Sequence, residues 1–409
     1  MVTSVECEPT RTYFQDGQYD GSAIDDEQTI LVMDDIGIEF PAVLRYRHRV
    51  KNIYELSTSG EIQAYNPSVV LPRYVVDILK LFDQLKDENQ KSIFVPALAA
   101  RDLSKEIFKK DSTIASQYRG YHGDMPLLYL MDKNPRAAFV LIRRPMINEA
   151  FKSEFCENNL GGFKERVSVL SDQLKSIMLV NKVTYVSWSG GYTLKFVSEE
   201  WDLHCVGKAK PSESDLREML LAVRPFYDVL FNSNGVMGFQ ATDTNVTEFT
   251  HPLDTTAEFK NRMRIGEYAT LDSGLPEDGV IGWREPPALN GYQSFRQWVD
   301  MFVNSGVLYA RPFPFNQTPL MESDILGLDA FPTSSTTTSW VTPVATSQAI
   351  YTKNKYFADA PMTNELIKLI REKMTPVGCY ANPSTDGDVC KVQDPLLYRK
   401  QELFRLGYE

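Results

Sequence analysis

The sequence lacks the short motifs that identify most enzyme families. Its 409 residues contain no Walker loop, no Gly-x-Gly-x-x-Gly fingerprint, no Gly-x-Ser-x-Gly elbow, no His-Glu-x-x-His pair, no EF-hand loop and no kinase signature. Carboxylates could perform general acid–base chemistry, but they are too plentiful to indicate a particular site. We therefore expect a structural or assembly protein rather than an enzyme, with no catalytic residue and no cofactor.

Cysteine and histidine are also scarce. The five cysteines are scattered, no Cys-x-x-Cys pair occurs, and their odd number leaves at least one thiol unpaired, which favours a reducing compartment. Only His204 and Cys205 are adjacent, and an isolated cysteine is usually a small buried hydrophobe, so no metal site is expected. Cys379 and Cys390 flank a turn, either as free thiols or as a loop disulfide under oxidising conditions.

Signals for secretion and membrane insertion are missing as well. The first residues lack the basic start and apolar run of a signal peptide, and no apolar run reaches the roughly 18 residues of a membrane helix. Hydrophobic residues make up 43% and charged residues 24% of the chain, which is typical of ordered domains. We expect an ordered protein that is neither secreted nor membrane-spanning.

Basic residues are nearly absent from the first part of the chain. Residues 1–40 hold ten acidic residues and one basic residue, Arg11, so this segment carries −9 of the total formal charge of −11. Such an acidic segment is either a solvated tail or an arm that contacts a partner.

Four cations follow directly at every second position, at Arg45, Arg47, Arg49 and Lys51. In a strand, alternate side chains share a face, so this spacing predicts a row of positive charge along one side. The row is either a solvent-facing edge strand that resists aggregation or a docking strip for an anion. The anion could be a phosphate backbone or the acidic segment of another copy. We take these four residues as the candidate anion-binding or subunit-contact site.

The nearest approach to a nucleotide motif is Ser189-Gly190-Gly191. These three residues are similar to the Ser-Gly-Gly phosphate loops of adenylating enzymes. The residues that follow read as a second strand rather than a helix N-terminus that could hold phosphate, so the pattern favours a hairpin turn within 183–197.

The spacing of apolar residues predicts both helices and strands. Periods near 3.6 indicate helices at 74–85, 163–180, 213–221, 293–303, 364–374 and 395–406. Short branched apolar runs indicate strands at 29–33, 137–142, 183–188, 192–197 and 201–206. The segment 312–343 is dense in Pro, Ser and Thr and predicts a long loop.

These elements predict an α+β fold with mixed helices and short antiparallel strands, an extended N-terminal arm and a long Pro/Ser/Thr-rich loop. We divide the chain into four units. They are an acidic arm at 1–40, an α+β core at 41–235, a loop-rich region at 236–345 and a C-terminal helical segment at 346–409.

The charge pattern and the missing motifs together favour a subunit of a symmetric homomeric shell, most plausibly a viral capsid protein. Its partners would be many copies of itself, other structural proteins of the particle and viral RNA through the basic strand, with no membrane partner. It would lie in the virion or the host cytoplasm. Two alternatives are an intracellular enzyme with an unrecognised carboxylate or arginine site, and a nucleoprotein that coats RNA.

Overall fold

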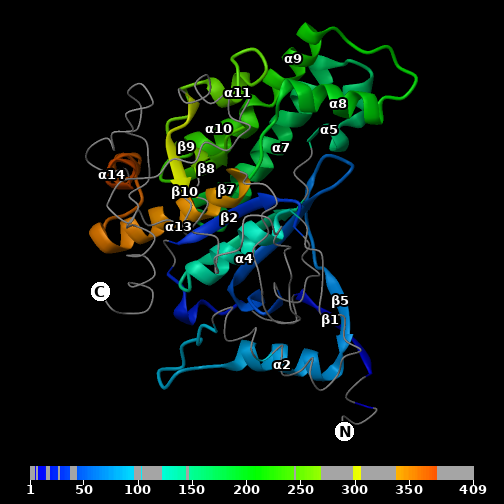
Figure 1. Ribbon diagram of the computed structural model, residues 1–409. Coiled ribbons are helices and arrows are strands. Elements are labelled where there is room, and N and C mark those ends of the chain that lie inside the picture. Colours follow the sequence, from blue (N-terminus) through cyan, green and yellow to red (C-terminus); the bar gives the residue numbers. More distant parts are fainter. Residues whose placement is uncertain are drawn as a thin grey trace, which may run out of the picture.

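The computed structural model describes residues 8–14, 19–25, 28–36, 44–95, 122–143, 147–243, 246–268, 298–304 and 338–374, with the single positions 5 and 103. These ranges form an eight-stranded sheet with helices on both faces and a separate two-stranded ribbon (Figure 1). The predicted helix at 395–406 and the turn between Cys379 and Cys390 lie outside the described residues.

The main sheet has the strand order β10-β9-β8-β7-β2-β6-β3-β4. All neighbouring pairs are parallel except the antiparallel pair of β3 and β4. Along the chain the strands are β2 (Thr29–Asp34), β3 (Val50–Leu56), β4 (Ile62–Ala64), β6 (Ala138–Arg143), β7 (Tyr185–Trp188), β8 (Met237–Ala241), β9 (Arg262–Tyr268) and β10 (Met301–Asn304). The first of these strands, β2, therefore lies inside the sheet, between β6 and β7.

Helices cover both faces of this sheet (Figure 1). One face carries α4 (Asp124–Lys133) and α13 (Thr338–Tyr356), with α14 (Asn364–Met374) beside α13. The other face carries α5 (Ile147–Ala150), α6 (Lys152–Cys156), α7 (Leu160–Val180), α8 (Leu194–His204), α9 (Glu213–Ala222), α10 (Arg224–Asn232) and α11 (Pro252–Thr255).

Strand β2 shows why the central strands read as continuous apolar runs. Side chains alternate across a strand, so Ile30 and Val32 join the core under α4 and α13, whereas Leu31 and Met33 join the core under α7. A parallel strand covered on both faces needs apolar residues at every position. All six residues of β2 are buried.

Several predicted elements are confirmed. Helix α7 covers the predicted range 163–180, and its buried positions follow the expected spacing, with Phe163, Val167, Leu170, Leu174 and Met178 in the core. The predicted helix at 213–221 is α9, which begins with a capping box formed by Ser212 and Asp215. The predicted helix at 74–85 is α2 (Arg73–Gln84), and the predicted strand at 137–142 is β6.

The α+β class is confirmed, but the predicted hairpin at 183–197 and the strand at 201–206 are wrong. After β7 the chain forms α8. Thr193 caps the N-terminus of this helix, and its side chain accepts a 3.0 Å hydrogen bond from the Phe196 amide. Long helical connections, such as the segment with α10 between β7 and β8, allow neighbouring strands to run parallel, so most strand pairs are parallel rather than antiparallel. The helix predicted at 293–303 is also wrong in its described part, where β10 begins at Met301.

Helix α13 takes the place of the last part of the loop predicted at 312–343, and Pro343 lies inside it. Its hydroxyl groups donate to carbonyl oxygens one turn back, from Thr342 to Thr338, from Thr346 to Thr342 and from Ser347 to Pro343. These bonds satisfy the hydroxyls without water. A helix with no amphipathic pattern is thereby buried along most of its length.

A two-stranded antiparallel ribbon lies apart from the main sheet (Figure 1). It is formed by β1 (Pro9–Tyr13) and β5 (Ser68–Pro72), and α2 follows β5 directly. The expected acidic arm thus contributes β1 to this ribbon and β2 to the middle of the main sheet. The division into units at residues 40, 235 and 345 stays a prediction.

One disulfide joins Cys156, at the end of α6, to Cys205, directly after α8. This pairing corrects the expectation that Cys205 is an isolated buried cysteine, whereas the reducing compartment stays a prediction. The two cysteines are 49 residues apart, and packing of the helices brings them together.

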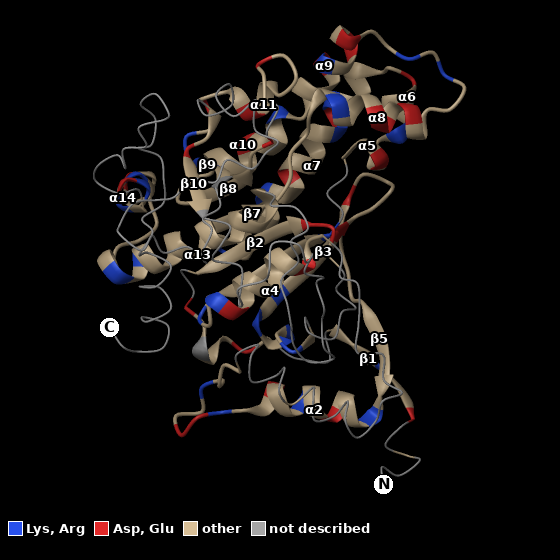
Figure 2. Ribbon diagram, in the orientation of Figure 1, with Lys and Arg blue, Asp and Glu red and all other residues tan. Residues whose placement is uncertain are grey.

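Charged residues gather on the outer helices and connections, and the strands of the main sheet are mostly uncharged along their length (Figure 2). In the ranges described, none of the helices has both the length and the apolar content needed to cross a bilayer.

Candidate functional site

The most distinctive site is a cavity of about 420 Å³ at the carboxyl ends of β2 and β7. From β2 the chain continues toward β3 on one side, and from β7 it continues toward β8 on the other side. Loops that leave adjacent parallel strands in opposite directions open a crevice, and ligands of open α/β sheets bind in such crevices. The cavity is lined by Asp34, Asp35, His122, Glu149, Trp188, Ser189, Gly190, Gly191, Tyr192 and Phe196.

Asp34 and His122 form a hydrogen-bonded pair in this cavity. Asp34 is the last residue of β2 and is 8% exposed, while the His122 side chain, just before α4, is 42% exposed. Oδ1 of Asp34 lies 2.8 Å from Nδ1 of His122 and also accepts a 2.7 Å bond from the Asp35 amide. The imidazole lies against the Trp340 ring of α13, with 4.9 Å between centroids. The carboxylate therefore fixes one nitrogen of an exposed imidazole.

The second oxygen of Asp34 differs from the first in its surroundings. Oδ2 is buried and has no hydrogen-bond partner among the described residues. Buried polar atoms in native structures are nearly always paired, so this oxygen is an exception among the described residues.

The electrostatics of the pair favour a charged imidazole. Burial lowers the pKa of His122, but the hydrogen bond to Asp34 and the charges of Asp34 and Asp35 together raise it above its ordinary value. Burial also raises the pKa of Asp34, against the opposing effect of His122. Both groups thus hold a proton more strongly than they would in water.

The loop Ser189–Gly191 forms the opposite wall, and its glycines are required by close packing. A Cβ at Gly190 would lie 2.9 Å from Nε1 of Trp188, and one at Gly191 would lie 2.9 Å from Nε2 of Gln240. Ser189 Oγ donates a 2.9 Å bond to the carbonyl of Ser339 in α13, which anchors the loop.

The loop Ser189–Gly191 leads into helix α8, so the prediction that it is a hairpin turn between two strands is wrong. The charge of the cavity nevertheless disfavours phosphate. Its ionisable lining residues are three carboxylates, one histidine and Tyr192. Among the described residues, no Lys or Arg lines it. A ligand that donates hydrogen bonds fits this lining better than an anion.

The candidate site predicted from the sequence, Arg45, Arg47, Arg49 and Lys51, does not form a row of surface charge. Arg47–Arg49 is a 3-10 helix rather than a strand, and the three arginines are at most 2% exposed. A 3-10 turn places successive residues about 120° apart, so alternate positions do not share a face. The predicted strand with one charged face is therefore wrong, and the role of these residues in anion binding or subunit contact stays a prediction.

Each of these cations has its own internal partner. Arg47 forms an ion pair with Asp83, at 2.8 Å through Nε. Lys51 donates to Oγ1 of Thr29 at 3.0 Å and to the carbonyl of Asn181 at 3.2 Å. Arg45 lies over the Tyr46 ring, 4.3 Å from its centroid. These contacts connect the segment to neighbouring elements instead of presenting it to an anion.

Arg49 holds the end of α4. It donates to the carbonyls of Met131 at 2.6 Å, of Ala137 at 3.2 Å and of Asn134. The last carbonyls of a helix lack intrahelical partners, and a cation there satisfies them. Burial lowers the pKa of Arg49 to about 10, so the side chain stays charged at neutral pH.

Comparison with protein-family models, with curated proteins and with solved structures finds no match. Within the described residues no three His, Cys, Asp or Glu side chains come together as a candidate metal site. The functional interpretation therefore depends on the geometry of the chain alone.

Proposed function

We propose that this chain is an enzyme in which His122, held by Asp34, transfers a proton at the carboxyl edge of the sheet. The observation that carries the proposal is the 2.8 Å bond between Asp34 and His122 in a 420 Å³ cavity where the chain leaves two adjacent strands in opposite directions. This favours the enzyme alternative over the expectation of a protein without catalytic residues.

The pair supports general acid–base catalysis by a simple division of roles. Asp34 accepts from Nδ1, which sets the orientation and tautomer of the ring and stabilises the imidazolium. Nε2 is then the nitrogen that takes a proton from a bound hydroxyl, amine or water and returns it later. The carboxylates of Asp35 and Glu149, which also line the cavity, would accept hydrogen bonds from the substrate.

Hydrolysis provides the test. Full-length protein would be assayed with a panel of chromogenic esters, amides and glycosides, whose cleavage needs activated water. Replacing His122→Gln should reduce kcat/KM by about 100-fold or more on any substrate that is turned over. His204→Gln is the matched control, because His204 pairs with Glu200 at 3.0 Å outside this cavity and should leave kcat/KM unchanged. No turnover in the panel, or equal loss in both variants, would count against the proposal.

A subunit of a homomeric shell is the second candidate, and the ribbon of β1 and β5 favours it. In the described part of the chain these strands pair only with each other, and Tyr13 and Val70 are 42% and 50% exposed. Short two-stranded ribbons are marginal alone and offer free edges to another chain. Further copies of this chain, and other structural proteins of a particle, would be the partners. The buried arginines do not serve RNA binding in this proposal.

Light scattering after size-exclusion chromatography tests assembly. A particle of many copies that falls to a monomer in the Tyr13→Lys, Val70→Lys double variant supports a shell in the virion or cytoplasm. A monomeric wild-type protein removes this candidate and leaves the enzyme.

A further inference from the structure

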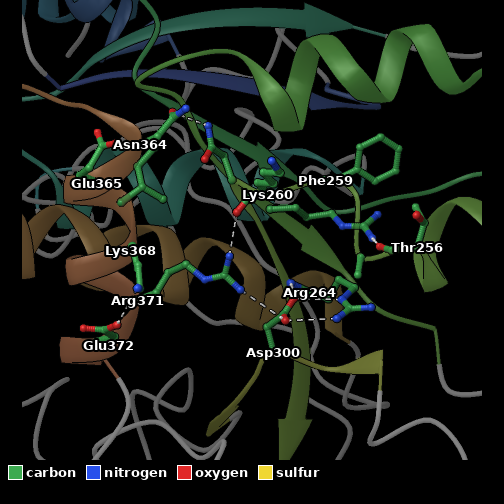
Figure 3. Close-up of a pocket in the computed structure, with 14 residues that line it drawn as sticks. Thr256, Phe259, Lys260, Arg264, Asp300, Asn364, Glu365, Lys368, Arg371 and Glu372 are labelled. Atoms are coloured by element: carbon green, nitrogen blue, oxygen red, sulfur yellow. Dashed lines mark hydrogen bonds and ion pairs between the residues drawn. The ribbon is translucent and has the colours of Figure 1, made fainter.

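A second cavity, of about 570 Å³, lies at the opposite edge of the sheet (Figure 3). It is beside the amino ends of β9 and β10, which begin at Arg262 and Met301, and it is walled on one side by α14. None of the residues that line it also lines the cavity of Asp34 and His122. Any ligand it takes would bind independently of the proposed active site.

The lining of this cavity is basic although the chain is acidic. Five cations line it, Lys260, Arg262, Arg264, Lys368 and Arg371, against three carboxylates, Asp300, Glu365 and Glu372. The excess of two positive charges stands against a formal net charge of −11 for the whole chain. A concave surface with one sign of charge concentrates ligands of the opposite sign.

Two of the arginines are fixed before any ligand binds. Arg264 reaches Asp300 from β9, with bonds of 2.9 Å from Nε and 3.1 Å from one terminal nitrogen. Arg371 reaches the same carboxylate from α14 at 3.5 Å and donates to the Lys260 carbonyl at 2.9 Å. Figure 3 shows the two guanidinium groups converging on Asp300 from opposite sides. Groups held in place in this way lose little conformational entropy when a ligand arrives.

Asp300 neutralises only one of the two guanidinium groups. Burial raises its pKa, but the hydrogen bond from Arg264 and the charges of Arg264 and Arg371 lower it below the ordinary value, so it is ionised at neutral pH. The trio of one carboxylate and two arginines thus keeps a single positive charge.

Two exposed lysines add to this charge. Lys260 precedes β9, and Lys368 lies on α14 with its side chain 79% exposed. Lys368 is 4.0 Å from Glu372, an exposed pair of the kind that contributes little. Both lysines can turn toward an anion at little cost to the fold.

We propose that this cavity binds a phosphate-bearing small molecule. The terminal nitrogens of Arg264 and Arg371 already donate to Asp300 and to backbone carbonyls, so these two residues contribute fixed positive charge, and Lys260 and Lys368 supply donors that reach phosphate oxygens. The volume is in the range of pockets that hold small-molecule ligands.

Calorimetric titration of the full chain with inorganic diphosphate at low salt tests the site. Saturable binding to one site is expected, and affinity should fall as salt is added because the lysines are exposed. The Lys260→Gln, Lys368→Gln double variant should bind about tenfold or more weakly, since both of the exposed charges are lost. Lys373→Gln is the matched control, because Lys373 is an exposed lysine of the same helix that does not line the cavity.

Three results would overturn the assignment. They are no heat of binding for wild-type protein, equal weakening in the double variant and the Lys373→Gln control, and tighter binding of citrate than of diphosphate. The last result would assign the cavity to carboxylates instead. None of these outcomes bears on the hydrolysis assays, so this proposal and the proposed enzyme can fail separately.

Discussion

Arg49 and Asp34 are both buried charged residues, but their surroundings differ. Arg49 is surrounded by carbonyl oxygens that together bond to each of its nitrogens. Asp34 bonds twice through one oxygen, and its other oxygen, which is buried, has no partner among the described residues. A buried charge with a full set of partners stabilises the fold, whereas a buried charge with an unpaired atom is satisfied less completely.

The largest effect in this comparison is expected at Arg49. Arg49→Met removes the guanidinium donors from the buried carbonyls of Met131 and Ala137, while the Asn134 carbonyl keeps its bond from the Ala137 amide, and should lower the free energy of unfolding by about 3 to 5 kcal/mol. Urea unfolding monitored by circular dichroism measures this loss. Lys175→Met, an exposed position on α7, is the control and should change stability by less than about 0.5 kcal/mol. A loss below 1 kcal/mol at Arg49 would show that the carbonyls find other donors, as in water.

The disulfide extends the comparison to the helices beside the cavity. Replacing both Cys156→Ser and Cys205→Ser opens a 49-residue loop in the unfolded chain and should cost about 2 to 4 kcal/mol. Unfolding of the wild-type protein with and without a reductant gives the same difference if the bond is formed. Identical stability in both conditions would indicate that the two thiols are unpaired in solution.

Gln348 tests whether an unpaired buried polar group matters when it lies away from a cavity. It lies in α13, is fully buried and, among the described residues, has no partner for either side-chain polar atom, yet it lines none of the cavities discussed above. If an unused polar atom matters only beside a cavity, Gln348→Met should stabilise the protein by about 1 to 2 kcal/mol by removing an unsatisfied amide of similar shape. A higher melting temperature supports this view, and a lower one would show that the amide is bonded in solution.

The smallest change in stability is expected at Asp34. Asp34→Asn keeps the shape of the side chain and should alter the free energy of unfolding by less than about 1 kcal/mol, but it removes the charge that raises the pKa of His122. The pKa of His122 should therefore fall, which NMR titration of the histidine ring protons measures. An unchanged pKa would remove Asp34 from the proposed mechanism.

The same pair predicts a pH dependence of stability. The pKa of His122 is higher in the folded state than its ordinary value of 6.5, so protonation favours folding. Its contribution is full below pH 6.5 and is lost as the pH rises through the folded pKa. The Asp34→Asn variant should show less of this dependence.

The sequence predicts the parts of the fold in which local pattern and tertiary burial agree. Helix α7 could be predicted because one side of it is apolar and the other is solvated. Helix α13 could not, because its threonines and serines bond to its own backbone and enter the core without an apolar stripe. The parallel pairing of the strands could not be predicted either, because the sequence of a short strand does not show in which direction its neighbour runs.

The candidate site could be predicted only in fragments. Asp34 follows a buried strand and Ser189–Gly191 follows another, which is the pattern of a carboxyl edge. His122 lies 88 residues from Asp34, and no local spacing connects the two. The regular spacing of the arginines at 45–49 predicted a charged strand face. Spacing alone does not show whether a cation faces solvent or a helix end.

The late position of α13 in the chain has a consequence for synthesis on the ribosome. This helix covers β7, β8 and β9 and packs against α4, yet it begins only at Thr338, about three hundred residues after β2. At roughly 5 to 20 residues per second, translation leaves that apolar face uncovered for some tens of seconds. A nascent chain in this state exposes apolar surface and is prone to aggregate until α13 has been made.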